Sequence, residues 1–68
     1  MAIENEIRRL RFENGEMTQA ALAERIGMTR QTVIAIEQNK YAPSLEAAFK
    51  IADAFGVPLA QVFRWSKG

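Results

Sequence analysis

The stretch QAALAERIGMTRQTVIAIEQ, residues 19–38, decides the fold that we predict for this chain. Two short segments with apolar residues at helical spacing meet at Gly27, and the second opens with four polar residues, 29–32. Only Gly27 and Met28 separate the first segment from Thr29, a favourable helix N-cap. A connection this short forces two helices to cross steeply, and glycine allows the left-handed backbone that such a turn requires. The stretch therefore predicts a helix-turn-helix.

The seam between these two helices is expected to be apolar. Leu22 and Ile26 recur at helical spacing in the first helix, and Val33 and Ile36 do so in the second. Ala23 is small at the position where a bulky side chain would push the second helix away. These residues indicate that the two helices pack directly against each other.

Three more helices are predicted, and no strand. The first carries Ile3, Ile7 and Leu10 at the spacing of one helix face and ends near Gly15. Another begins after the cap Ser44, and we expect its inward face to comprise Leu45, Ala48, Phe49 and Ala52, widened by Ile51 and Phe55. The last begins with Pro58 as its first residue and turns Leu59, Val62 and Phe63 inward. The predicted fold is all-α, a compact five-helix bundle in one domain spanning residues 1–68.

Composition narrows the classes of function. The 68 residues include no cysteine and no histidine, so the usual zinc ligands and the commonest general base are absent. There is no glycine-rich phosphate loop and no inward pair of carboxylates, so we expect no enzyme, no metal and no cofactor. No apolar run reaches the roughly 18 residues of a membrane span, and no signal peptide is evident. A cytoplasmic location is expected.

The stretch LRFENGEMTQAALAERIGMTRQTVIAIEQNKYAPSLEAAFKIADAFGVPLAQVF, residues 10–63, resembles short, single-domain members of the phage-repressor/Cro-like (XRE) family. The markers, in order, are Thr18-Gln19, Leu22-Ala23, Gly27, Thr29-Arg30-Gln31-Thr32, Ile36-Glu37, Pro43-Ser44-Leu45 and Val62-Phe63. One departure is the turn GEM before Thr18, which is one residue longer than in many members. The resemblance implies a lambda-repressor-like DNA-binding domain that usually acts as a dimer, in a bacterium or phage.

The polar start of the second helix of the motif then has a physical reason. The N-terminal turn of a recognition helix, here residues 29–38, enters the major groove and presents its first outward side chains to base edges. Arg30 can pair with guanine and Gln31 with adenine, each through two hydrogen bonds. The methyl groups of Thr32 and Ala35 suit thymine. The predicted base contacts are therefore Arg30, Gln31, Thr32 and Ala35.

Contacts to the phosphate backbone are expected on both sides of this helix. By the resemblance, Gln19 holds a phosphate with its side chain and the adjacent amides. The chain that follows the recognition helix would face the other strand. The full predicted set is Gln19, Thr29, Gln38, Asn39, Lys40, Tyr41 and Ser44.

Glu37 falls on the buried face of the recognition helix, at i+4 from Val33, where a lone carboxylate would be unfavourable. Arg11 falls on the inner edge of the first helix, at i+4 from Ile7. We predict an ion pair between Arg11 and Glu37, as at the corresponding positions of the family. The alternative is an exposed Glu37 beside Lys40.

The C-terminal residues VPLAQVFRWSKG, 57–68, offer a surface for a homodimer. The candidates are Val57, Leu59, Phe63 and Trp65, with the alternative that Phe63 completes the core and Trp65 packs back onto it. A dimer would let two recognition helices read two half-sites of a palindrome.

Two functions remain open at this point. The first is a transcriptional regulator, a repressor, that binds double-stranded DNA sequence-specifically. The second is a protein-interaction module, such as an antitoxin-like subunit whose main partner is another protein. Only the first requires steeply salt-dependent binding to duplex DNA.

Overall fold

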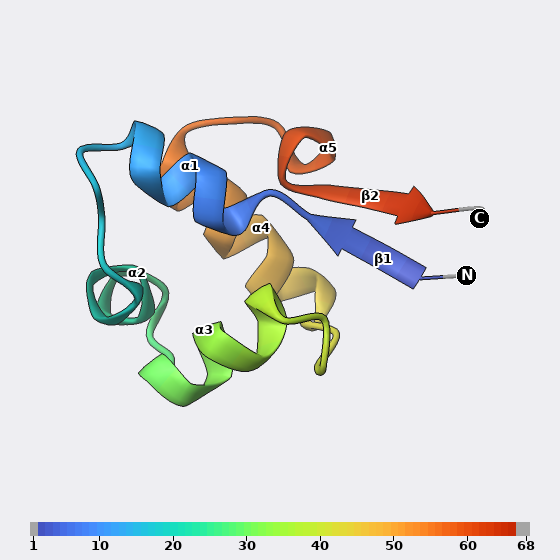
Figure 1. Cartoon of the computed structure of the whole chain (residues 1–68), viewed down its shortest axis with the longest axis horizontal. Helices are drawn as coiled ribbons and strands as arrows, with labels where there is room; N and C mark the ends of the chain where they lie inside the picture. Colours follow the sequence, from blue (N-terminus) through green and yellow to red (C-terminus); the bar gives the residue numbers. More distant parts are fainter. Residues whose placement is uncertain (1, 67–68) are drawn as a thin grey trace.

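The computed structural model describes residues 2–66, in which five helices surround one apolar core and two strands pair at one end (Figure 1). The elements, in order, are β1 (Ala2–Asn5), α1 (Ile7–Glu13), α2 (Gln19–Ile26), α3 (Arg30–Glu37), α4 (Leu45–Phe55), α5 (Leu59–Val62) and β2 (Phe63–Ser66). Among the described residues, no helix is both long enough and apolar enough to cross a membrane.

The predicted helix-turn-helix is confirmed by α2 and α3. In Figure 1, α2 is seen along its axis while α3 runs across the view, so the two helices cross steeply. Gly27 adopts the left-handed conformation, with φ of 71°, and the amide of Met28 returns to the carbonyl of Ala23 at 2.9 Å. Ala23 is 3% exposed, and its small side chain allows the two helices to approach closely.

Three hydroxyl residues cap the starts of α2, α3 and α4, and the caps at Thr29 and Ser44 were predicted. Thr18 accepts a hydrogen bond from the amide of Ala21 at 3.0 Å, at the start of α2. Thr29 and Ser44 accept in the same way at the starts of α3 and α4, at 3.2 and 3.1 Å. Each cap satisfies one amide that the helix leaves unpaired, which is worth about 1 kcal/mol. The ends of these helices are therefore set locally.

The core gathers aliphatic side chains from all five helices. The buried members are Ile7, Leu10, Leu22, Ala23, Ile26, Val33, Ile36, Ile51, Ala52, Phe55 and Val62. Each large aliphatic residue contributes roughly 1.5–3 kcal/mol by leaving water. The predicted seam between α2 and α3 lies inside this core, so α3 packs directly on the core.

The predicted inward face of α4 is partly wrong. Leu45 and Phe49 are 66% and 54% exposed, whereas Ala47, which was not predicted, is buried. Two apolar faces overlap on this helix, and the core takes the one centred on Ile51 and Phe55. The helical pattern of the sequence alone does not show which of these two faces turns inward. Packing of α4 against α2 decides it, because that contact requires the alanine-rich face.

The five predicted helices are present, but the fold is not strictly all-α, because two strands also form. Ile3 lies in β1 and not in the first helix, and Phe63 leaves α5 to begin β2. The two strands pair antiparallel, with Ile3 opposite Trp65 and Asn5 opposite Phe63. Pro58 is the N-cap of α5, because its ψ of 152° is extended, and not the first helical residue. We call these two strands the terminal ribbon. Each has only four residues, too few to show a strand pattern in the sequence, and each is a strand only because it pairs with the other.

The two faces of the terminal ribbon differ in chemistry. Residues that alternate along a strand point to opposite faces. Arg64 pairs with Glu4 at 3.0 Å and with Glu6, while Ile3 and Trp65 share the other face and are 40% and 58% exposed. The ribbon therefore has an ionic face and an apolar face.

The ionic face predicts a dependence on pH. Hydrogen bonds from Arg64 hold the pKa of Glu4 and Glu6 below their ordinary value of 4.5. A carboxylate with a lowered pKa stabilises the folded ribbon above that ordinary value, and this contribution is lost as the pH falls through the lowered pKa. In Arg64→Gln, the ribbon amides should exchange with deuterium faster than in the wild type at about pH 6. The difference should shrink as the pH falls below 4.5.

The matched control is Lys50→Gln, which removes an exposed pair with Glu46 on α4. It should leave exchange of the ribbon amides unchanged. Equal exchange in Arg64→Gln and the wild type at about pH 6 would contradict the role of the ionic face.

Candidate nucleic-acid interface

The first turn of α3 presents polar side chains outward. Arg30 and Gln31 are exposed, and Ala35 is half-buried one turn further along. The hydroxyl of Thr32 lies 3.0 Å from that of Thr29, whose oxygen also caps the helix. Of the predicted base contacts, Arg30 and Gln31 therefore have the freest side chains, while the Thr32 hydroxyl already has a partner.

Glu37 is held at the other end of α3 by a network that the sequence predicted in part. Arg11 Nε donates to Glu37 Oε2 at 3.1 Å and Arg11 Nη2 to Glu37 Oε1 at 3.0 Å, so the pair is bidentate. The two side chains are 16% and 8% exposed. The predicted ion pair is present, and the alternative of an exposed Glu37 beside Lys40 is not.

Arg11 and Glu37 bind two further groups that join α2 to this pair. Gln19 Nε2, at the start of α2, donates to Glu37 Oε2 at 3.2 Å. Arg11 Nη1 donates to the carbonyl of Met17 at 2.8 Å, in the turn that precedes α2. One charge pair therefore links α1, α2 and α3.

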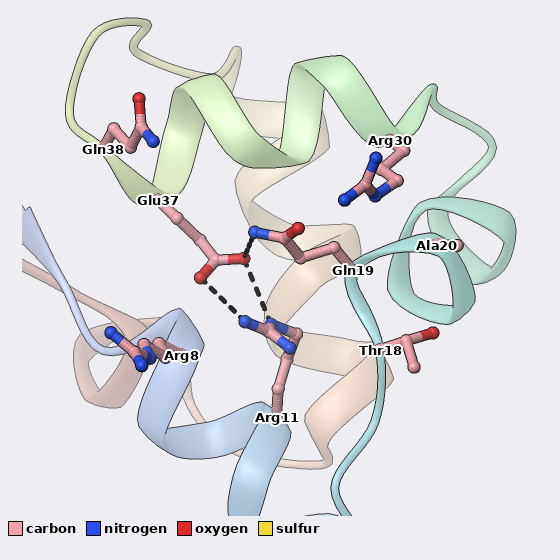
Figure 2. A pocket seen from close by; sticks show the side chains of 8 residues that line it. All are labelled: Arg8, Arg11, Thr18, Gln19, Ala20, Arg30, Glu37 and Gln38. Atoms are coloured by element: carbon pink, nitrogen blue, oxygen red, sulfur yellow. Dashed lines mark hydrogen bonds and ion pairs between the residues drawn. The ribbon is translucent and has the colours of Figure 1, made fainter.

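An open hollow of about 690 Å³ lies over this network, and we call it the basic hollow. It is lined by Arg8, Arg11, Thr18, Gln19, Ala20, Arg30, Glu37 and Gln38. Figure 2 shows Arg8 on one side of the network and Arg30 on the other. The hollow is bordered by α1, by the start of α2 and by the two ends of α3. It therefore combines side chains from separate parts of the chain.

The charges of the basic hollow do not cancel. Arg11 neutralises Glu37, whereas Arg8 and Arg30 have no carboxylate within salt-bridge distance among the described residues. Arg9 is the opposite case, because it pairs with Glu6 and Glu13 on the outer side of α1. The basic hollow is therefore positive.

Sequence reasoning missed Arg8 as a member of this site. The signal was available, because Arg8 precedes Arg11 by three residues and residues at that spacing share a helix face. Once Arg11 was predicted to face α3, Arg8 could have been placed on the same side.

The residues after α3 are exposed, as a backbone-contacting loop requires. Asn39 has a positive φ of 60°, and the amide of Lys40 donates to the carbonyl of Ala35 at 2.9 Å, which reverses the chain at the helix end. Tyr41 is 53% exposed. Ser44 is exposed but uses its hydroxyl as the cap of α4. Two further predicted backbone contacts, Gln19 and Gln38, line the basic hollow.

Apolar side chains gather at the terminal ribbon. Leu59, Phe63 and Trp65, three of the four predicted dimer residues, line a shallow hollow of about 400 Å³ together with Ile3. Leu45 lines a neighbouring hollow with Ile3, Leu59 and Phe63. The fourth predicted residue, Val57, lines neither hollow, and it is partly buried against the core, as Leu59 and Phe63 also are. We call Ile3, Leu45, Leu59, Phe63 and Trp65 the terminal apolar surface.

The network around Glu37 yields a prediction for stability. Arg11→Ala should lower the free energy of unfolding by about 3–5 kcal/mol, because a nearly buried carboxylate loses its bidentate partner. Urea denaturation followed by circular dichroism measures the change. Arg9→Ala is the matched control, since it removes an arginine of the same helix whose pairs are exposed, and it should change stability little. Equal denaturation midpoints for the two variants would refute the structural role of the pair.

Comparisons with known proteins place this geometry in a family. The family model described as helix-turn-helix matches residues 7–62, which run from the first residue of α1 to the last of α5. The crystal structure of a candidate DNA-binding protein from Bacteroides fragilis superposes with a TM-score of 0.81 at 29% identity. That alignment covers 91% of this chain and 98% of that one.

Relatives in sequence agree. An uncharacterised HTH-type transcriptional regulator of Methanocaldococcus jannaschii is 55% identical over 47 residues, 69% of this chain and 71% of the relative. YgzD of Bacillus subtilis, another such regulator, is 44% identical over 61 residues, 90% and 91% of the two chains. The transcriptional repressor RstR of a cryptic phage in Vibrio cholerae is 36% identical over 58 residues, 85% of this chain and 51% of the repressor. The chain belongs to the phage-repressor/Cro-like (XRE) helix-turn-helix family of transcriptional regulators, and not to a family of enzymes.

Proposed function

We propose that this protein is a repressor that binds double-stranded DNA as a homodimer on a palindromic site, with α3 in the major groove. One observation carries the proposal: the exposed polar turn at the start of α3 borders a positive hollow, and an exposed loop follows at its other end. This arrangement offers base-reading side chains between two places that suit phosphates. The relationship to a phage repressor supports the direction of regulation.

Base reading would rest mainly on Arg30 and Gln31. Both side chains are exposed at the first turn of α3, the part of a recognition helix that meets base edges. Arg30 suits guanine and Gln31 suits adenine, and each such pair discriminates by about 1–3 kcal/mol. Thr32 and Ala35 would offer methyl groups, because the Thr32 hydroxyl is already bonded to Thr29.

Phosphate binding would occur in the basic hollow and at the loop after α3. In the hollow, the unpaired amides at the start of α2 lie with Arg8 and Arg30, so a phosphate would meet both a helix N-terminus and guanidinium groups. Gln19 uses one amide hydrogen for Glu37 and retains another for a phosphate. Asn39, Lys40 and Tyr41 would contact the opposite strand.

The terminal apolar surface would join two copies. It lies at one end of the long axis of the molecule, where the strands extend beyond the helices (Figure 1). The described chain is 31 Å long in that direction, so two copies in contact end to end would have centres about that far apart. One turn of DNA is about 34 Å, the spacing at which two recognition helices meet successive major grooves.

A protein-interaction module is the second candidate, and the same apolar surface favours it. Exposed Trp65, Ile3 and Leu45 together form the kind of patch that mediates protein association. The two candidates differ in what the α3 face does, so DNA binding separates them.

The proposed DNA contacts can be tested by fluorescence anisotropy on a duplex site selected from a random library. Affinity should fall steeply between about 50 and 200 mM salt. Arg30→Ala should relax the preference at one base pair, while Lys40→Ala should weaken binding to all sequences and reduce the salt slope by about one. Lys50→Ala, on α4, is the matched control and should bind like the wild type. Folded wild-type protein that shows no salt-dependent binding would favour the interaction module.

The proposed dimer can be tested by sedimentation equilibrium. Trp65→Ser should raise the dimer dissociation constant at least tenfold, because it removes the most exposed aromatic of the terminal apolar surface. Phe12→Ser is the matched control, since Phe12 is 68% exposed on α1 and lines none of the apolar hollows described above. A wild type that is monomeric both alone and on its DNA site would exclude the homodimer.

A further inference from the structure

Asn5, the last residue of β1, forms hydrogen bonds to the C-terminal end of α3. Its Nδ2 donates to the carbonyl of Ile36 at 3.0 Å and to Oδ1 of Asn39 at 2.9 Å, with a longer contact to the carbonyl of Glu37 at 3.4 Å. Its Oδ1 accepts from the amide of Ile7 at 3.1 Å. One side chain thus bonds to the C-terminal end of α3 and to the start of α1.

Asn5 adds to the hydrogen bonds that already end α3. The last carbonyls of a helix lack amide donors from the helix itself, and a reversal of the chain satisfies only some of them. Here the amide of Asn39 returns to Ile36 and that of Lys40 to Ala35. Asn5 adds a donor from more than thirty residues away and also holds the side chain of Asn39. The direction in which residues 39–41 leave the helix is therefore set partly by β1.

We propose that Asn5 is a positioning residue for DNA binding. It holds the end of α3 and Asn39 so that Lys40 and Tyr41 meet the phosphate backbone on that side of the groove. This role rests on the proposed function, because it concerns the loop that would contact the second strand. It also links the terminal ribbon, where the second copy would bind, to the helix that would read the DNA.

The two ends of the Asn5 amide have separable roles. The oxygen forms a local turn that begins α1, which serine or threonine also forms with its hydroxyl. The nitrogen reaches α3, and a hydroxyl on the shorter side chain of serine does not extend to the same carbonyls. Asn5→Ser therefore keeps the turn and removes the hydrogen bonds to α3, without adding charge.

The experiment compares the salt dependence of binding to a random duplex for the wild type and Asn5→Ser. We expect Asn5→Ser to bind several-fold more weakly at about 100 mM salt, with a slope of log affinity against log salt that is smaller by about one. A variant that is merely less folded would bind more weakly by the same factor at every salt concentration and keep the wild-type slope. The slope thus distinguishes positioning from stability.

Asn14→Ser is the matched control. The Nδ2 of Asn14 donates to the carbonyl of Leu10 at 2.8 Å, so this variant also removes an asparagine that bonds to a helix end, but at α1. It should keep the wild-type salt slope. Asn5→Thr, which suits a strand better, replaces Asn5→Ser if that variant is unfolded at the assay temperature.

Two results would overturn the proposal, and they differ. A folded Asn5→Ser or Asn5→Thr with the salt slope of the wild type, whatever its affinity, would exclude the positioning role and leave the proposed function intact. A wild type without salt-dependent binding would remove the proposed function and, with it, this role of Asn5.

Discussion

The structure depends on one nearly buried carboxylate. Glu37 ends the recognition helix on its inner side, where an unpaired charge would be strongly unfavourable. Its two oxygens are satisfied by Arg11 of α1 and Gln19 of α2, and Arg11 also reaches the turn before α2. The geometry must satisfy all of these bonds together, so the three helices have little freedom to rotate against one another. A buried pair adds little net stability, but it selects one arrangement over similar apolar packings.

That arrangement of the three helices places basic side chains around the start of α2. The network neutralises Glu37 and leaves Arg8 and Arg30 on either side of it, so the surface around the start of α2 is positive although the chain as a whole carries a formal charge of only +1. Position, and not total charge, makes this face suitable for an anionic partner. At the same end of α3, Asn5 holds the loop that follows the helix, with a neutral amide in place of an ion pair.

The terminal ribbon adds a second ordered surface to the small domain, apart from the surface around α3. Its ionic face closes the two chain ends onto each other, and its apolar face continues into Leu45 and Leu59 at the surface of the helices. Side chains that a larger domain would bury remain exposed here, because a chain of this length encloses little volume. The core face of α4 is formed by Ala47, Ala48, Ile51, Ala52 and Phe55, so Leu45 and Phe49 lie outside it.

The sequence by itself determined the helix-turn-helix, its caps and its apolar seam. These features depend on residues close in the chain or on a helical period, which a linear pattern expresses directly. The Arg11–Glu37 pair joins two separate helices, and it was predicted because a buried carboxylate needs a partner and because the family resemblance implies a pair at these positions. The terminal ribbon, the orientation of α4, the grouping of Arg8 with Arg30 and the bonds of Asn5 were decided only by the tertiary structure. Each of them joins residues from separate elements, such as Ile3 with Trp65, and four-residue strands carry too little periodicity to reveal their partners. Residues close in the sequence therefore predict the helices of the motif, whereas contacts between residues far apart in the sequence determine which side chains share a surface.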